Sequence, residues 1–252
     1  MTGGIGALTF AITKVNDWGF ASPGIAGSTA VAVILLALFV WRCFRSKNPF
    51  VDPALFRIRP FAGAALVMAP YSAAFGAMLL SVALFEQSAW GWSALKTGLA
   101  IAPGPLLVPI TSLLLASRLI ARFGAAAVVT AGVFFFVAGL VVWGLLIGEQ
   151  PSLLYVIAGM IFTGIGVGLT FPTLMGVGAG GLPPSAFATG SGVINMIRQA
   201  ALAVGVAMFV AIIGTPNSLT ERVTAFHRGW WIMAAVAALA LIPNYIFIKG
   251  KK

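Results

Sequence analysis

The feature that most constrains this chain is a series of apolar runs, each long enough to cross a membrane as a helix. Residues 25–44, 61–85 and 125–147 are three of these runs. The hydrocarbon core of a bilayer is about 30 Å thick, and a helix needs roughly 20 mainly apolar residues to cross it. Only helices and closed barrels satisfy their backbone hydrogen bonds within lipid. The pattern therefore predicts an all-α integral membrane protein.

Composition and charge point to the same class. The chain is 60% hydrophobic and 8% charged, whereas soluble domains hold about 25% charged residues. The net charge of +10 comes from basic residues at the ends of apolar runs, so we interpret it as a topology signal and expect no nucleic-acid partner. Cys43 and His227 are the only residues of their kinds. We therefore expect no metal site, no cofactor and no enzymatic activity.

Along the chain, the runs predict one partial helix followed by seven complete crossings. Residues 4–15 are apolar but cover only about 18 Å as a helix. The complete crossings are predicted at residues 25–44, 61–85, 97–119, 125–147, 153–181, 190–213 and 230–248. The third of these contains Pro103, Pro105 and Pro109, and proline interrupts helical hydrogen bonding. We expect a kinked helix there.

The basic residues separate cleanly between alternate loops. Ten lie on the side of the C-terminus, namely Arg42, Arg45, Lys47, Arg57, Arg59, Arg118, Arg122, Lys249, Lys251 and Lys252. Four lie on the other side, namely Lys14, Lys96, Arg222 and Arg228. Loops rich in Lys and Arg stay in the cytoplasm. This count predicts a cytoplasmic C-terminus and an outward-facing loop at residues 215–229.

One arginine lies inside a predicted crossing. In the stretch 190–199, helical spacing places Asn195 and Arg198 on one face, with Gln199 beside them. A charged side chain inside a membrane costs roughly 2.5–3.5 kcal/mol on insertion scales. Arg198 is therefore expected to face protein or water, in a role in substrate binding or gating. The alternative is a passive anchor that extends its charge to one membrane surface.

Small residues mark places where helices can pack closely. Gly164 and Gly168 are four residues apart and share one face of a predicted crossing. Gly164 to Gly168 could suggest a phosphate-binding loop, but no strand precedes it. We therefore predict helix packing through Gly164 and Gly168, and assign the same role to Pro172 and Gly205.

The order of these features resembles the major facilitator superfamily, and within it the fourteen-helix drug:proton antiporter family. The resemblance covers essentially the whole chain, and its motifs are Asn-Asp-Trp-Gly-Phe at 16–20, Leu-Phe-Arg at 55–57, and the ordered stretches 164–172, 190–199 and 205–207. Four positions depart from the family pattern: Ala121 replaces an acidic residue, Ala200 and Ala201 replace a glycine pair, and Glu86 replaces an apolar residue.

This resemblance implies a domain organisation. Residues 1–44 would be a partial helix and the second helix of the central extra pair, 45–60 a cytoplasmic loop, and 61–252 the C-terminal six-helix bundle. The motifs of the first six helices are absent from this sequence, so an N-terminal half is an expected partner. The lipid bilayer of the cell inner membrane, a small amphipathic substrate and protons are the other expected partners.

The resemblance also implies alternating access to a site between two six-helix halves. The candidate substrate-binding or gating residues are Asn195, Arg198, Gln199, Gln87, Tyr71, Phe75 and Met78. Helix packing is the competing interpretation, above all for the three apolar members. The five acids all lie at or near predicted helix ends. A metabolite transporter of the same fold, and an inert fragment that needs a partner half, remain alternative functions.

Overall fold

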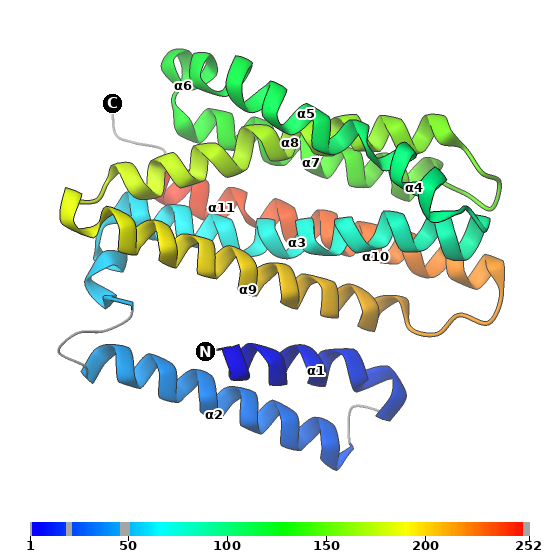
Figure 1. The fold of residues 1–252 in the computed structure, drawn as a ribbon, viewed down its shortest axis with the longest axis horizontal. Helices are drawn as coiled ribbons and strands as arrows, with labels where there is room; N and C mark the ends of the chain where they lie inside the picture. Colours follow the sequence, from blue (N-terminus) through cyan, green and yellow to red (C-terminus); the bar gives the residue numbers. More distant parts are fainter. Residues whose placement is uncertain (1, 19–21, 46–50, 249–252) are drawn as a thin grey trace.

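The computed structural model describes residues 2–18, 22–45 and 51–248, and every regular element in these ranges is helical (Figure 1). The long helices are α1 (Thr2–Trp18), α2 (Pro23–Arg45), α3 (Arg59–Trp90), α7 (Ala125–Leu146), α8 (Leu153–Gly180), α9 (Phe187–Ile213) and α10 (Leu219–Leu239). The shorter ones are η1 (Pro53–Arg57), α4 (Ala94–Ile101), α5 (Pro103–Thr111), η2 (Ser112–Ala116), α6 (Ser117–Phe123), η3 (Pro184–Ala186), α11 (Leu241–Pro243) and η4 (Asn244–Ile248). The predicted all-α class is confirmed.

Six helical stretches within the described residues are long and apolar enough to cross a membrane. They are Arg59–Trp90, Ala94–Phe123, Ala125–Leu146, Leu153–Gly180, Pro184–Ile213 and Leu219–Ile248, and they follow the order of the last six predicted crossings. The remaining predicted crossing corresponds to α2, which is 23 residues long. The chain is a multi-pass membrane protein.

Three predictions fall wholly or partly outside the described residues. Gly19 and Phe20 of the predicted turn are outside them, as are residues 46–50 of the predicted cytoplasmic loop. The terminal lysines at 249, 251 and 252 are also outside. The predicted domain limits therefore stay predictions.

Helix α3 occupies the centre of the bundle and packs against α8, α9 and α10. Helix α7 packs against α8 and α10, and α5 also packs against α8. The pair α1–α2 lies beside α9, which it contacts through α1 (Figure 1). The candidate site lies in this part of the bundle, where α3, α5, α8 and α9 come together.

The proline-rich crossing is interrupted, as the sequence predicts. Helix α4 ends at Ile101, and Pro103 begins α5. A second proline, Pro109, lies inside α5 and is followed by the π-helical turn η2. Proline removes a backbone donor and displaces the preceding turn, which accounts for the break between α4 and α5. Single π-helical turns of this kind occur frequently at functional sites.

Glycines of α8 allow its close contact with α5. A side chain on Gly164 would meet the backbone of Gly104, and one on Gly168 would meet Thr111 and the carbonyl of Val108. Pro172, in contrast, lies inside α8 with its own side chain exposed. The two glycines lie where α8 and α5 come close together, and the predicted packing roles, including that of Pro172, stay predictions.

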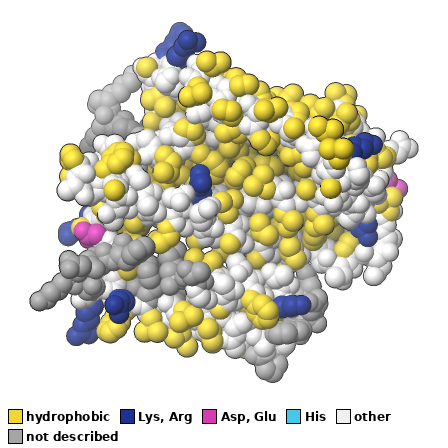
Figure 2. All heavy atoms as spheres, viewed as in Figure 1, with side chains coloured by type: hydrophobic (Ala, Val, Ile, Leu, Met, Phe, Trp, Pro, Cys, Tyr) yellow, Lys and Arg dark blue, Asp and Glu magenta, His cyan; other side chains and the backbone are white. Residues whose placement is uncertain are grey.

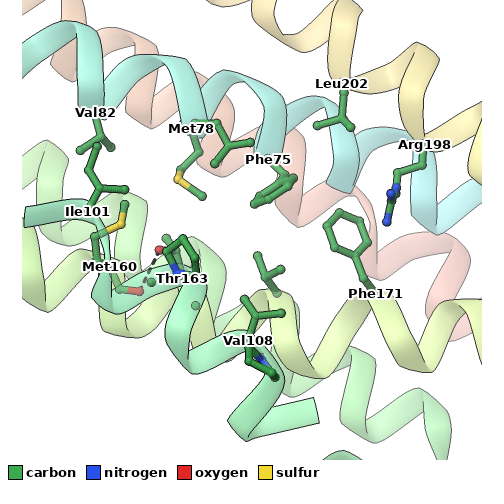
Figure 3. A pocket seen from close by; sticks show the side chains of 16 residues that line it. Phe75, Met78, Val82, Ile101, Val108, Met160, Thr163, Phe171, Arg198 and Leu202 are labelled. Carbon is green, nitrogen blue, oxygen red and sulfur yellow. Dashed lines mark hydrogen bonds between the residues drawn. The ribbon is translucent and has the colours of Figure 1, made fainter. Parts of the chain in front are cut away.

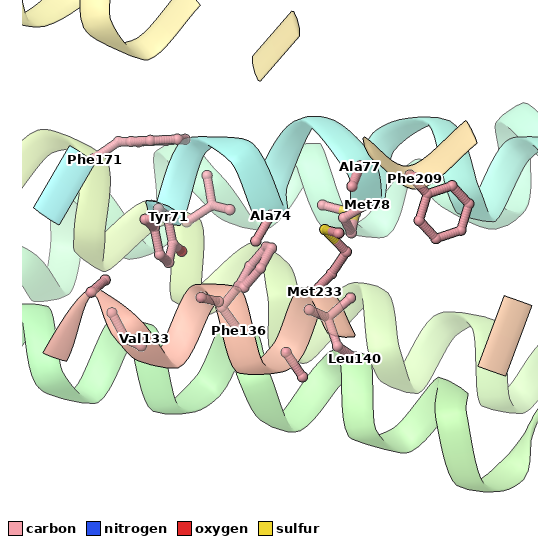
Figure 4. Close-up of a cluster of buried hydrophobic side chains, with 14 of the residues drawn as sticks. Tyr71, Ala74, Ala77, Met78, Val133, Phe136, Leu140, Phe171, Phe209 and Met233 are labelled. Carbon is pink, nitrogen blue, oxygen red and sulfur yellow. The ribbon is translucent and has the colours of Figure 1, made fainter. Parts of the chain in front are cut away.

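Aromatic side chains fill the interior between α3, α7, α8 and α10. Trp230 donates a hydrogen bond from Nε1 to the Ser81 hydroxyl at 3.0 Å. The rings of Phe85 and Trp143 lie 5.4 and 6.1 Å from that of Trp230, measured between centroids. Figure 4 shows the neighbouring part of this core, where the Tyr71 side chain of α3 lies near Phe136 of α7.

Candidate functional site

A cavity of about 350 Å³ lies between α3, α5, α8 and α9 (Figure 3). Its lining residues are Phe75, Met78, Leu79, Val82, Ile101, Gly104, Pro105, Val108, Pro109, Met160, Thr163, Gly164, Val167, Phe171, Arg198 and Leu202. Cavities that bind small molecules span about 300–1,000 Å³ and are mainly apolar with a few polar groups. This cavity meets both conditions.

The walls of the cavity combine aromatic rings with methionines. The rings of Phe75 and Phe171 meet edge to face, with centroids 5.2 Å apart and an interplanar angle of 79°. Met78 and Met160 line the wall beside them, and in Figure 3 both project toward the space between α3 and α8. Methionine is flexible and polarisable, so such walls adapt to different apolar shapes.

Arg198 is the one charged residue among the described residues that line the cavity. It extends from α9, and its guanidinium carbon lies 5.4 Å from the centre of the Phe171 ring. Its buried Nε has no hydrogen-bond partner among the described residues. A guanidinium attracted by the face of an aromatic ring is a cation–π contact. The geometry thus holds a positive charge at the end of an apolar cavity.

The structure brings some of the predicted site residues together and separates others. Phe75, Met78 and Arg198 all line the cavity. Tyr71 is fully buried behind it, with its ring 5.3 Å from that of Phe171. The three predicted polar residues Gln87, Asn195 and Gln199 are exposed and do not line the cavity. The binding roles of these residues stay predictions.

Glu86 is a buried acid that the sequence did not single out as a site residue. It is 1% exposed, and neither carboxylate oxygen has a hydrogen-bond partner among the described residues. The buried hydroxyl of Thr97 lies close to this carboxylate. Glu86 follows the cavity residue Val82 by one helical turn, and Thr97 precedes Ile101 by one turn on α4. The sequence signal for this residue was its departure from the family pattern, in which position 86 is apolar.

Metal ligands do not gather in the described part of the chain. Within residues 2–18, 22–45 and 51–248 there is no group of three or more His, Cys, Asp or Glu side chains that could hold a metal ion. Cys43 is a buried free thiol. The described lining residues could instead bind a ligand through apolar contacts and through the Arg198 guanidinium.

No family model matches this chain, but several curated proteins do. The multidrug resistance protein Stp of Mycobacterium tuberculosis is 30% identical over 217 residues, which is 86% of this chain and 40% of that protein. The lincomycin resistance protein LmrB of Listeria monocytogenes is 27% identical over 266 residues, which is 99% of this chain and 55% of that protein.

A third relative supplies a description of the family. The uncharacterized MFS-type transporter YcnB of Bacillus subtilis is 22% identical over 259 residues, which is 100% of this chain and 54% of that protein. The chain thus spans about half the length of the curated relatives it matches. These relatives are named as resistance proteins or as a transporter.

Proposed function

We propose that this chain, a homologue of MFS-type multidrug resistance transporters, forms the C-terminal half of a proton-coupled exporter. The proposed substrates are amphipathic drugs or toxic compounds. The observation that carries the proposal is the apolar cavity that ends at Arg198. Transporters of this architecture place their substrate near the bilayer midplane, between two halves that alternate access. A cavity of this kind on one half is what that mechanism requires.

An N-terminal half is the proposed partner. The chain spans about half of its relatives, and its cavity is lined by five neighbouring helices of one bundle, namely α3, α4, α5, α8 and α9. Figure 2 shows hydrophobic side chains spread across the visible face, with most Lys and Arg toward its edges and one near its centre. Such a face suits contact with lipid or with a second apolar helical bundle.

The proposed orientation in the cell inner membrane has a cytoplasmic C-terminus. Ten basic residues on that side against four on the other support it. Proton coupling is assigned to acids of the N-terminal half, because the described residues that line the cavity include no acid. Arg198, Phe75 and Met78 are the residues of this half that we propose to contact substrate.

The test is transport by the full-length protein that contains this chain, in everted membrane vesicles. A panel of fluorescent amphipathic compounds of different charge is supplied outside the vesicles, and an imposed proton gradient is expected to drive the uptake of at least one. A protonophore should abolish that uptake. The 252-residue chain alone should show none, because half of the alternating site is missing. Uptake that does not depend on the proton gradient, or uptake by this chain alone, would contradict the proposal.

A further inference from the structure

Arg198 lies too deep in its helix to serve as an end anchor. Helix α9 runs from Phe187 to Ile213. At 1.5 Å per residue, Arg198 is about 16 Å from the first residue and about 22 Å from the last. Arginines that extend their charge to the membrane surface lie near helix ends. Arg198 instead lines the cavity and points toward Phe171 in Figure 3.

The guanidinium makes no hydrogen bond or ion pair with a described residue. Its Nε is buried without a partner, and its one described interaction is with the ring of Phe171. Contact with a ring occupies a face of the planar guanidinium and leaves its N–H groups, which point outward in the plane, free to donate. The buried Nε–H donor therefore lacks an acceptor in the described part of this chain.

The rest of the cavity wall offers no other free hydrogen-bond donor among the described residues. Thr163 is the one other lining residue with a polar side chain among the described residues. Its hydroxyl donates within its own helix, to the carbonyl of Gly159 at 2.9 Å or that of Met160 at 3.2 Å. All remaining lining side chains are apolar or absent. An occupant with one charged acceptor and an otherwise apolar body would match this distribution.

We propose that the cavity selects aromatic acids, whose carboxylate binds Arg198 while the ring packs on Phe75 and Phe171. This inference rests on the proposed function and names the substrate class of that site. A carboxylate matches the guanidinium fork in a bidentate geometry. The edge-to-face pair of phenylalanines, with centroids 5.2 Å apart, supplies the surface that an aromatic body prefers.

A cationic substrate fits the cavity poorly. The described lining residues include Arg198 and no acid, so a cation would meet a like charge without compensation. An acid contributed by the other half could also satisfy Arg198, and the transport experiment below separates that case. The two cases differ in whether the charge of the substrate matters.

The binding experiment uses the purified 252-residue chain in neutral detergent, with 2-naphthoate and 2-naphthamide as probes. The two probes share a ring system and differ in charge. Equilibrium dialysis, corrected with empty micelles, is expected to give at least tenfold tighter binding of naphthoate. Arg198→Gln should reduce this preference to less than twofold, and Arg198→Lys should retain part of it, because lysine keeps the charge without the fork. Circular dichroism and gel filtration verify that each variant is folded.

Gly192→Ala serves as the matched control on the same helix, because an added methyl group there meets no atom within 4 Å. It should keep the full preference for naphthoate. Equal binding of the two probes to the unmodified chain would overturn the proposal, as would an unchanged preference in Arg198→Gln.

The transport experiment uses the full-length protein in everted vesicles with the same two probes. Arg198→Gln should slow naphthoate at least tenfold more than naphthamide. Equal slowing of both probes would indicate that Arg198 pairs with an acid of the other half, and it would overturn the substrate proposal. Export of other compounds would still stand in that case, so failure here is distinguishable from failure of the proposed function.

Discussion

Gly205 of α9 lies directly against the carbonyl oxygen of Ala73 in α3, with no room for a side chain between the two helices. The same crossing brings Gly76 of α3 against the backbone of Leu202. Leu202 also lines the cavity. Two glycines, one on each helix, therefore fix the distance between α3 and α9 and with it the position of Arg198, one turn from Leu202 on α9.

Gly205→Ala should destabilise the protein. The added methyl group would overlap backbone atoms of Ala73, and overpacking of this kind typically costs about 1–3 kcal/mol. Thermal unfolding of the purified chain in detergent should show a Tm several degrees lower. Gly192→Ala is the control, because its methyl group meets no neighbour. An equal Tm for the two variants would mean that α9 can move away from α3 at little cost.

Ser81→Ala should also destabilise the protein. The Ser81 hydroxyl accepts the hydrogen bond from Trp230 Nε1 at 3.0 Å, and both residues are buried. Without it a buried donor is left unsatisfied, which costs about 1–3 kcal/mol. Thermal unfolding measures the loss. Ser88→Ala, at an exposed position on the same helix, should leave the Tm unchanged. A normal Tm for Ser81→Ala would show that Trp230 finds another acceptor.

Glu86→Gln should keep or raise the stability of the protein. Glu86 is 1% exposed, and its carboxylate oxygens have no hydrogen-bond partner among the described residues, although the Thr97 hydroxyl lies close by. Glutamine preserves its size and its capacity for hydrogen bonding but cannot ionise, so it removes the cost of a buried charge without a cation. The Tm in detergent is the measurement. Gln87→Glu, at the exposed neighbouring position, is the control for adding an acid to this turn. A large loss in Glu86→Gln would indicate that Glu86 has a cationic partner.

The topology prediction is tested by cysteine labelling in intact cells on a Cys43→Ser background. Basic residues number ten on the side of the C-terminus and four on the other, so Lys251→Cys should be protected from a membrane-impermeant maleimide. Ser218→Cys lies in the predicted outer loop and should react. Permeabilised cells control for reagent access and should label both. The reverse pattern in intact cells would require the opposite orientation.

The sequence alone determined the membrane class and the positions of most helices. Long apolar runs predicted the six membrane-length helices of the described residues, because hydrocarbon admits backbone only when its hydrogen bonds are satisfied within the segment. Pro103 and Pro109 predicted the interruption of the third crossing. These are local properties, and a single stretch of sequence contains them.

Only the tertiary structure decided which faces of these helices meet one another. The interior of a helical membrane protein is about as apolar as lipid, so hydropathy does not distinguish a face that packs on protein from one that meets the bilayer. Helical spacing grouped Asn195 with Arg198, yet Arg198 lines the cavity and Asn195 is exposed. Likewise Gln87 is exposed while Glu86 beside it is buried. The contacts between neighbouring helices determine which of these side chains is buried, and the local sequence pattern does not.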